Sequence, residues 1–467
     1  MQTLAFFLYI GLLFIFSVSS FSIAVTKIQY PVSRRGLIAL RQSDTDQDQD
    51  LDPDKLVDPS LKFENPRIKK AYCALQEWKK AMISDPLNMT GNWVGPNVCS
   101  YYGVGCVPAL DDEQIRTVAA VDLNFGDISG QLVPHLGLLA DLGILHLHSN
   151  RFCGIVPKTF SNLELLFELD LSNNRFSGLF PTPVLTLPSL RFLDIRFNEF
   201  EGPLPPALFD KDVDAIVVNN NRFSSHIPKN MGNSPASTIV LSNNKFSGCI
   251  PRSIGRMPNI EQVSFSNNRL TGCLPEELGM PKFLNVLDVS KNYFLGPLPK
   301  SLERMEMIER LDVSSNHLTG KVHDSVCGLS ALWNFTIFDN YFNEIGGECE
   351  KRSRDNLIMQ DRENCFSGKP NQRSQQDCSS VLTRPVDCKT IGCQPRDPLI
   401  LELNKRKPPL VHSPSPPDPQ TPKVTPTHKT TQLASPTPPV VSPLPARAVK
   451  NFPPKIGSQH SSPPRGH

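Results

Sequence analysis

The sequence has 467 residues, with 48 Lys and Arg against 46 Asp and Glu, so its net charge is only +2. Charge this nearly balanced gives no general basic surface for nucleic acid, and no nucleic-acid partner is predicted. The 12 cysteines and 44 prolines are more informative, because they indicate disulfide bonds and long extended segments.

An apolar run from Leu4 to Val18 opens the chain and is followed by small and polar residues up to Ala24. We interpret this stretch as a signal peptide, which predicts a secreted protein in a compartment where disulfides form. The run is marginal as a membrane anchor, and no second apolar run of spanning length follows. The sequence therefore predicts no membrane span.

An acidic linker is expected next. Between Asp44 and Asp54 every second residue is aspartate, which resembles the start of a calcium-binding EF-hand loop. Gln49 stands where such a loop needs glycine, and Lys55 stands where it needs glutamate. We therefore predict a solvated linker here, with no metal site and no cofactor.

A helical cap should precede the repeats. Asn65 followed by Pro66 marks a helix start, and the pattern continues to about Ile83. The apolar stripe of this helix places Cys73 on the opposite, solvent-facing side. Cys73 could bond to Cys153, remain a thiol, or form an intermolecular disulfide that makes a homodimer.

Two further features belong to the cap and to the end of the repeats. Cys99 and Cys106 follow Trp93 just before the first repeat, an arrangement typical of a cap disulfide. Asn88 and Asn334 each begin an Asn-x-Thr acceptor for N-glycosylation. A glycan on Asn334 would oppose ligand contact at that end of the repeats.

A single asparagine recurs every 23 or 24 residues, at residues 150, 174, 198, 221, 244, 268, 292, 316 and 340. Apolar residues precede it by eight, five and three positions, and another follows by two, as with Leu166, Leu169, Leu171 and Phe176. An earlier copy has Gly126 at the asparagine position. This period and frame are typical of a leucine-rich repeat solenoid.

Each repeat should contribute one short strand, and the strands should pair in parallel about 4.8 Å apart. The stacked asparagines can satisfy backbone groups at the turn that leaves each strand. The predicted fold is α/β: a right-handed leucine-rich repeat solenoid of about ten plant-type repeats with a parallel concave sheet. A helical N-terminal cap, a disulfide-rich C-terminal hinge and a disordered proline-rich tail complete it.

Most repeats continue Gly-x-x-Pro after the asparagine, which resembles the plant-specific class of leucine-rich repeats. Cys249 and Cys273 occupy the same position in adjacent repeats, so we expect a disulfide between them. Cys327 and Cys349 bracket the last repeat and could join its ends.

The segment after the repeats holds a separate cluster of cysteines, Cys365, Cys378, Cys388 and Cys393, with three possible internal pairings. A zinc site is the alternative, although disulfides are expected outside the cell.

Residues 401–467 contain 17 prolines, with nine Lys and Arg against Glu402 and Asp418. Extended polyproline II and disorder are expected there. The positive charge suits a polyanion, which in a plant wall means pectin. A solubilising role explains the charge equally well.

On the concave face, the side chains that alternate with the buried ones should point to solvent. Five aspartates (122, 170, 194, 288 and 312) share one repeat position and form a discontinuous acidic ladder suited to a basic peptide. An ordinary solvated face is the alternative. The predicted peptide-binding residues are His146, His148, Asp170, Phe192, Asp194, Arg196, Asn219, Asp288 and Asp312.

Three stretches carry a more specific resemblance: "NPRIKKAYCALQEWKKAMISDPLNMTGNWVGPNVCSYYGVGCVPALDD", "LFDKDVDAIVVNNNRF" and "NCFSGKPNQRSQQDCSSVLTRPVDCKTIGC". Over residues 58–395 the chain resembles the leucine-rich repeat extensins of plant cell walls. The resemblance implies a wall glycoprotein whose repeats bind rapid alkalinisation factor peptides, which are small, basic and cysteine-containing. It also implies a tail, with hydroxyproline, that anchors the protein, so that the two parts regulate wall formation and growth. No tyrosine follows Tyr341, so attachment through tyrosine cross-links is not implied.

Three other functions fit the same residues less well. An extracellular inhibitor of microbial polygalacturonases uses the same repeat class but usually ends at its C-terminal cap. A receptor-kinase ectodomain lacks support without a membrane span. An enzyme is not predicted, since His146 and His148 on one strand lack a third metal ligand. The expected segments are 1–24 signal peptide, 25–64 linker, 65–112 cap, 113–349 repeats, 350–395 hinge and 396–467 tail.

Overall fold

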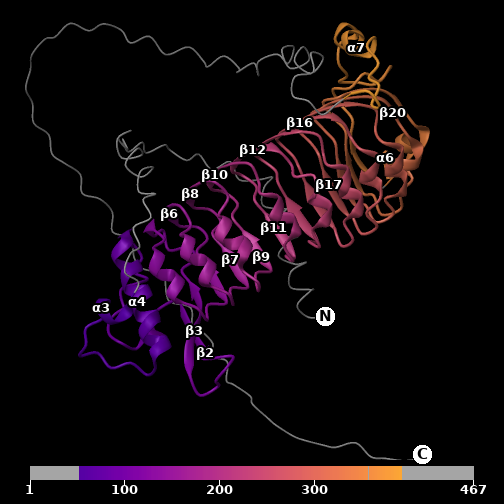
Figure 1. The fold of residues 1–467 in the computed structure, drawn as a ribbon. Helices are drawn as coiled ribbons and strands as arrows, with labels where there is room; N and C mark the ends of the chain where they lie inside the picture. Colours follow the sequence, from indigo (N-terminus) through magenta and orange to yellow (C-terminus); the bar gives the residue numbers. More distant parts are fainter. Residues whose placement is uncertain (1–51, 356, 392–467) are drawn as a thin grey trace, which may run out of the picture. The chain divides into compact units, whose positions relative to one another are not determined.

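The computed structural model describes residues 52–355 and 357–391, and these form the fold shown in Figure 1. The predicted signal peptide, most of the acidic linker, Cys393 and the proline-rich tail lie outside the described residues. None of the described helices combines the length and apolar character needed to cross a membrane.

The first of two long sheets carries the predicted concave face, with one short strand from each coil. All its pairs are parallel except β2 with β3, which confirms the predicted parallel solenoid. Its strands are β2 (Val104–Pro108), β3 (Arg116–Asp122), β5 (Ile144–His146), β7 (Glu168–Asp170), β9 (Phe192–Asp194), β11 (Ala215–Val217), β13 (Thr238–Val240), β15 (Gln262–Ser264), β17 (Val286–Asp288), β19 (Arg310–Asp312), β21 (Asn334–Thr336) and β23 (Ile358–Gln360).

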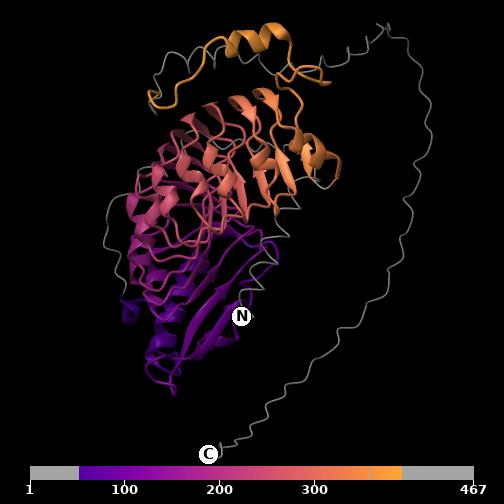
Figure 2. The ribbon, with the colours of Figure 1, turned by 90° about the vertical axis from the view of Figure 1, so that its right-hand side faces the viewer.

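A second sheet, which was not predicted, runs along the other side of the turn that holds the asparagines (Figure 2). Five of its eleven strands, β6, β8, β10, β14 and β18, end at the glycine of Gly-x-x-Pro, whose positive φ reverses the chain, as at Gly178 (φ 87°). Its strands are β1 (Met82–Ser84), β4 (Ser129–Gln131), β6 (Arg151–Gly154), β8 (Arg175–Gly178), β10 (Glu199–Gly202), β12 (Arg222–His226), β14 (Lys245–Gly248), β16 (Arg269–Cys273), β18 (Tyr293–Gly296), β20 (His317–Val322) and β22 (Tyr341–Ile345).

Short helices complete the coils and the ends of the described chain. The α-helices are α3 (Pro53–Leu56), α4 (Pro66–Ala81), α5 (Asp324–Cys327), α6 (Gly347–Asp355) and α7 (Gln375–Leu382). The 3-10 turns are η1 (Val98–Ser100), η2 (Pro134–Leu138), η3 (Lys158–Asn162), η4 (Thr182–Thr186), η5 (Pro206–Asp210), η6 (Met231–Asn233), η7 (Arg252–Arg256), η8 (Glu276–Gly279) and η9 (Lys300–Arg304).

The recurrent asparagine joins neighbouring coils, as predicted. The Nδ2 of Asn198 donates to the carbonyl of Leu171 in the preceding coil at 2.9 Å and to that of Ile195 in its own coil at 3.2 Å. Its Oδ1 accepts from the N–H of Phe176 at 2.9 Å. The same pattern occurs at Asn364, which was not predicted as a member of the series. The repeat pattern therefore continues one coil beyond Asn340.

A column of phenylalanines fills the core two positions after the asparagines. Phe152, Phe176, Phe200, Phe223 and Phe246 stack with ring centroids 6.2–6.5 Å apart and nearly parallel planes. All five are at most 1% exposed. Because each ring covers the next, no coil buries its apolar face alone.

The cap helix α4 begins as predicted, because the Asn65 side chain accepts from the N–H groups of Arg67 and Ile68. It ends at Ala81, two residues before the predicted end, because the chain from Met82 enters β1 and pairs with β4. The first coil is thus closed by both a helix and a strand.

The prediction that Cys73 faces solvent is wrong. Its side chain is 2% exposed, because α4 packs against η2 as well as against β3 and so buries more than one stripe. Burial raises the pKa of the Cys73 thiol to about 11, which keeps it protonated and unreactive. Cys73 and Cys153 are both free thiols, so of the alternatives given for Cys73 the bond to Cys153 is excluded and the thiol remains.

Three disulfides join cysteines that are near each other in the sequence, one in the cap and two at the C-terminal end of the repeats. Cys99 bonds to Cys106 in the cap, and Cys327 bonds to Cys349 around the last repeats, as predicted. Cys365 bonds to Cys378, a pair within the predicted hinge cluster, but Cys388 bonds outside the cluster, so none of the three complete internal pairings is correct.

The predicted bond between Cys249 and Cys273 is wrong. Cys273 bonds to Cys388 of the hinge, with 5.7 Å between the two Cα atoms, and Cys249 is also disulfide-bonded. Equivalent side chains on stacked parallel coils point outward side by side rather than toward each other. The Cys273 sulfur is therefore available to the hinge segment that contains Cys388.

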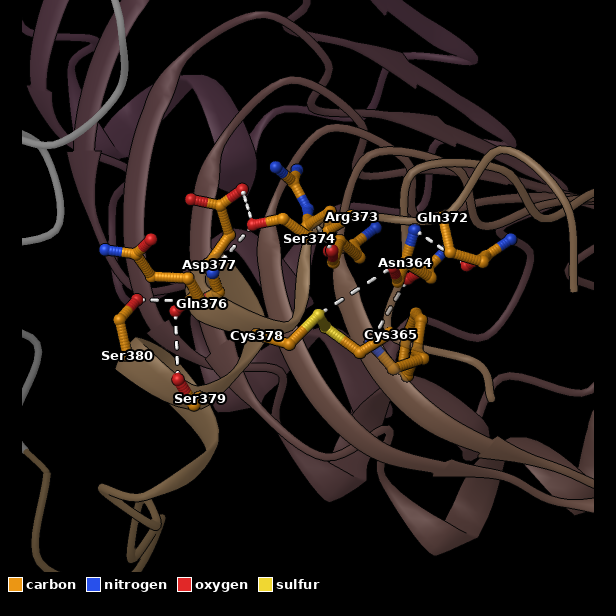
Figure 3. The surroundings of a disulfide bond; sticks show 12 residues. Asn364, Cys365, Gln372, Arg373, Ser374, Gln376, Asp377, Cys378, Ser379 and Ser380 are labelled. Atoms are coloured by element: carbon orange, nitrogen blue, oxygen red, sulfur yellow. Dashed lines mark hydrogen bonds between the residues drawn. A yellow bond between two sulfur atoms is a disulfide. The ribbon is translucent and has the colours of Figure 1, made fainter. Parts of the chain in front are cut away.

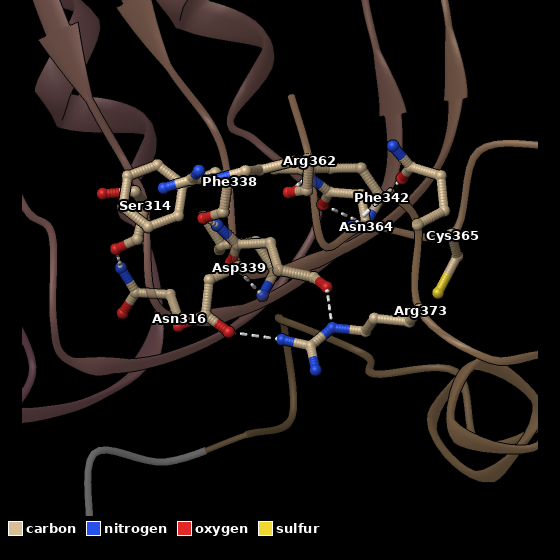
Figure 4. A network of polar contacts seen from close by, with 12 residues as sticks. Ser314, Asn316, Phe338, Asp339, Phe342, Arg362, Asn364, Cys365 and Arg373 are labelled. Carbon is tan, nitrogen blue, oxygen red and sulfur yellow. Dashed lines mark hydrogen bonds and ion pairs between the residues drawn. The ribbon is translucent and has the colours of Figure 1, made fainter. Parts of the chain in front are cut away.

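The hinge is held to the last coil by contacts around the Cys365–Cys378 disulfide (Figure 3). Ser374 caps α7 by accepting from the N–H of Asp377 at 3.1 Å. Arg373 donates through Nε to the carbonyl of Asn340 at 2.7 Å and forms an ion pair with Asp339 (Figure 4).

Candidate functional site

The predicted acidic ladder exists as one row across the concave sheet. Strand register places Asp122, His146, Asp170 and Asp194 side by side in consecutive coils. The row continues through Val217, Val240 and Ser264 to Asp288 and Asp312. The row therefore contains two groups separated by three uncharged residues. The N-terminal group holds Asp122, His146, Asp170 and Asp194, and the C-terminal group holds Asp288 and Asp312.

A histidine and a glutamate pair at the N-terminal group. The Nε2 of His146 lies 3.0 Å from a carboxylate oxygen of Glu168 on the neighbouring strand, and both side chains are about a quarter exposed. The hydrogen bond to Glu168 raises the pKa of His146 above its ordinary value, against the opposing effect of burial. The Glu168 carboxylate therefore favours the imidazolium form of His146.

His148 lies on the next outward position of the same coil. Its ring packs edge-on against Phe125, with centroids 4.2 Å apart, and its Nδ1 lies 3.1 Å from the hydroxyl of Ser149. Burial lowers the pKa of His148 below its ordinary value, although Asp170 and Asp122 act in the other direction. The pKa values of the two histidines are thus shifted in opposite directions.

Asp194 does not face solvent, so the exposure predicted for it is wrong. It is 2% exposed and pairs with the Arg196 side chain, whose Nε lies 3.1 Å from a carboxylate oxygen. Burial raises the pKa of Asp194 to about 7, despite the nearby guanidinium. The buried carboxyl group of Asp194 therefore positions the Arg196 side chain and is not accessible to a ligand.

This burial leads to a testable effect on stability. The carboxyl of Asp194 keeps its proton in the folded protein up to about pH 7 but ionises near its ordinary pKa of 3.8 when unfolded. Folded-state stability should fall as pH rises from about 4 to 7, by at most about 4 kcal/mol. Asp194→Asn removes this loss and keeps the acceptor for the Arg196 N–H. We expect it to be more stable than wild type at pH 8, by about 1–3 kcal/mol after loss of the ion pair.

Urea unfolding of wild type, Asp194→Asn and Asp170→Asn at pH 4 and pH 8 measures this effect. Asp170 is half-buried in the same row, so it is a matched control. An Asp194→Asn protein that is less stable than wild type at pH 8 would show that the ion pair with Arg196 outweighs the burial of the carboxylate.

The remaining predicted residues of this group are half-buried and accessible from the concave side. Asp170 accepts the N–H of Ser172 at 2.8 Å, which fixes its carboxylate over the sheet. Phe192 is paired in register with Glu168. Asn219 follows β11, in the coil after Arg196. The structure thus brings the first seven predicted residues together on four neighbouring coils, those of β5, β7, β9 and β11.

Three exposed aromatic side chains at this group were missed. Phe125 is 67% exposed, Phe167 46% and Phe197 48%. Phe125 and Phe197 have φ of 58° and 53°, at a position where other coils have residues such as Asn173. Left-handed backbone disfavours bulky residues, so a phenylalanine at an Asn position was the signal that could have identified them.

The C-terminal group centres on two aspartates. Asp288 and Asp312 accept the N–H groups of Ser290 and Ser314, each at 2.9 Å. Burial, reinforced by the charge of Asp288, raises the pKa of Asp312 to about 6. Beside them the guanidinium of Arg310 lies 5.8 Å from the ring centre of Trp333, which is 40% exposed and was not predicted.

The two predicted glycosylation acceptors differ in access. Asn88 is exposed and lies in a turn after the cap helix. Asn334 is half-buried on β21 of the concave sheet, where its Oδ1 accepts the hydroxyl of Thr336 at 3.2 Å. Within the residues that the structure describes, no cluster of three His, Cys, Asp or Glu side chains could hold a metal ion.

Sequence families match the repeats and the cap. Leucine rich repeat families match residues 141–200, 237–257, 259–280 and 307–329, and the leucine rich repeat N-terminal domain matches residues 72–107.

Relatives with extensin names are closely similar. The chain is 64% identical over 337 residues to pollen-specific leucine-rich repeat extensin-like protein 3 of Arabidopsis thaliana, an alignment that covers 72% of this chain and 46% of that protein. It is 57% identical over 196 residues to leucine-rich repeat extensin-like protein 4 of the same plant, with 42% and 39% covered. The chain spans less than half the length of these relatives.

Solved structures show the same fold. A plant ice-binding protein is 26% identical with a TM-score of 0.56, over 66% of this chain and 97% of that one. The ectodomain of the Arabidopsis receptor kinase HAESA, in complex with an N-terminally extended IDA peptide hormone, is 25% identical with a TM-score of 0.53. That match covers 64% of this chain and 54% of the ectodomain.

Proposed function

Through its cap and repeats this chain belongs to the leucine-rich repeat extensin family, and from that premise we propose that it is a secreted cell-wall protein that binds peptides. The concave sheet takes small, basic, cysteine-containing signals of the rapid alkalinisation factor type. Through them the protein regulates wall formation and growth. Its relatives carry extensin names rather than enzyme names, in line with a role in binding.

One observation carries the proposal. On β5, β7 and β9 half-buried charged groups are held in fixed positions, as His146 is by Glu168 and Asp170 is by Ser172. Phe167 and Phe197 are exposed beside them. Aromatic anchors next to positioned carboxylates are what a basic peptide with apolar side chains requires. The HAESA ectodomain, which shares the fold, was solved with a peptide hormone.

The C-terminal tail extends the proposal to wall polysaccharide. Residues 401–467 lie outside the described residues, and their sequence has nine Lys and Arg against two acidic residues. We propose ionic attachment to pectin through these charges, which salt should weaken. Retention of the protein on de-esterified pectin that is unchanged by salt would oppose this attachment.

A matched pair of substitutions tests the peptide site. Asp170 and Asp288 share one row, and each accepts a serine N–H through Oδ1, which Asn also provides. We expect Asp170→Asn to weaken binding of a basic peptide by about tenfold, since one positioned charge is lost. Asp288→Asn, five coils away, should change binding by less than about twofold.

Titration calorimetry of the secreted chain with a panel of basic cysteine-containing peptides measures both values, alongside a fungal polygalacturonase. Weakening by Asp288→Asn alone would move the site to the C-terminal group. Inhibition of the polygalacturonase without peptide binding would replace the proposal with the inhibitor function.

A further inference from the structure

An apolar groove lies on the second sheet, at the ends of β8, β10 and β12. Its volume is about 420 Å³, and its walls include Leu179, Phe180, Pro203, Ile227 and Pro228. Leu179 is 68% exposed, although it is a large aliphatic side chain on a regular coil. Lys229 provides a positive charge among the residues that line the groove.

The groove continues the row of coil positions to which the hinge is bonded. Leu179, Pro203 and His226 each stand five residues after the asparagine of their coil, and so do Cys249 and Cys273. Cys273 bonds to Cys388, and the sulfur of Cys388 lies so close to Gly296 that an added Cβ there would be 2.6 Å from it. The described part of the hinge therefore covers this row at the coil of Gly296 and does not contact it at the coils of Gly178 and Gly202.

Burial of the turn glycines shows the same boundary. Gly248, Gly272 and Gly296 are buried, whereas Gly178 and Gly202 at the same coil position are only half-buried. The side chain of His226 lies over Gly248, and Cys388 and Val386 lie over Gly296. Among the described residues, Gly178 and Gly202 are each approached only by the exposed aliphatic side chain of the preceding coil.

The hinge approaches the groove from the C-terminal end. Cys378 is bonded to Cys365 next to Asn364, and only ten residues later Cys388 is bonded to Cys273, four coils earlier. The chain thus returns by about 19 Å along the solenoid at the usual strand spacing. The described chain ends at Ile391, three residues after Cys388, in a turn whose N–H groups at Thr390 and Ile391 donate to the carbonyl of Asp387.

We propose that residues 398–403, Pro-Leu-Ile-Leu-Glu-Leu, occupy this groove in the same chain. Four of these six residues are large aliphatics, which suits walls of leucine, phenylalanine, isoleucine and proline. Glu402 is the only charged residue of the segment and complements Lys229.

The length of the connection also fits. Pro203 is three coils from Cys273, which corresponds to about 14 Å. Leu399 stands eleven positions after Cys388, and an extended chain of that length reaches about 36 Å. The segment can therefore fill the groove without moving the disulfide. This inference does not depend on which ligand the concave sheet binds.

Hydrogen–deuterium exchange of the full chain, read by mass spectrometry, tests the proposal. Backbone amides of residues 399–403 should exchange at least about tenfold more slowly than in a free peptide of the same sequence. Leu179→Asp should abolish this protection, because it places a charge in the groove. Ile155→Asp is the matched control: Ile155 has the same coil position and is 53% exposed, but does not line the groove.

An exchange of the charges of Lys229 and Glu402 provides a second test that does not depend on the folding of the Leu179→Asp variant. Lys229→Glu and Glu402→Lys should each reduce the protection, and the two together should restore it. Exchange at the free-peptide rate in wild type would overturn the proposal, as would protection that survives Leu179→Asp. Protection that appears only as protein concentration rises would assign the groove to a second copy.

Discussion

Replacing Asn268 with alanine is expected to lower the free energy of unfolding by about 3–5 kcal/mol, because several buried backbone groups lose their partners at once. The Nδ2 of Asn268 donates to the carbonyls of Leu241 and Phe265, both at 3.0 Å, and its Oδ1 accepts from the N–H of Phe246 at 3.0 Å. Alanine satisfies none of these.

Asn259→Ala is the matched control for this substitution. Asn259 lies in the same repeat, is exposed, and makes a single hydrogen bond, from Nδ2 to the carbonyl of Pro235 at 3.2 Å. We expect a change of less than about 1 kcal/mol. Chemical denaturation of both variants measures the difference, and equal losses would show that the asparagine series contributes little to stability.

Replacing Trp78 with alanine is expected to cost about 3–5 kcal/mol, because a large buried ring is removed where the cap meets the first coils. Trp78 is fully buried, with its ring 5.6 Å from Phe152 and 6.0 Å from Trp93 between centroids. It thereby connects the cap helix to the phenylalanine column. Without it, the first coil exposes its end to solvent.

Trp78→Phe tests whether a smaller aromatic ring is enough to maintain the packing at the same position. The Nε1 of Trp78 is buried and has no hydrogen-bond partner among the described residues. Phenylalanine keeps an aromatic ring and removes this unpaired group, so we expect a loss of less than about 1.5 kcal/mol. Thermal unfolding of the two variants provides the measurement. A loss for Trp78→Phe as large as that for Trp78→Ala would mean that the full volume of the indole, and not an aromatic ring alone, is needed at this position.

The spacing of the coils was predictable because an asparagine makes the same hydrogen bonds to the backbone in successive coils. The amide of an asparagine such as Asn198 has the donors and acceptor that the turn needs, so its recurrence reports the coil directly. The second sheet was not predictable in this way. Its strands are short and lie between the asparagine and the glycine, and they show no alternation that separates them from a loop.

The errors had a common physical origin in contacts between distant segments. Cys273 bonds to a residue 115 positions away, and its equivalence with Cys249 gave no sign of that partner. Cys73 is buried because α4 meets η2, which no helical stripe reveals. Asp194 occupies an outward position, yet Arg196 two residues later covers it. Periodicity predicts which way a side chain points, but not what lies above it.

The three uncharged positions in the concave row, Val217, Val240 and Ser264, also have an electrostatic consequence. Asp194 and Asp288 lie four coils apart, or about 19 Å at the usual strand spacing, whereas the Debye length at physiological salt is about 8 Å. Protonation of His146 therefore has almost no effect on the electrostatic potential at Asp312, and the two groups are electrostatically independent. A ligand shorter than this gap can contact only one of the two groups. A ligand that spans the gap could bind both groups, and the connection through its own backbone would increase its affinity.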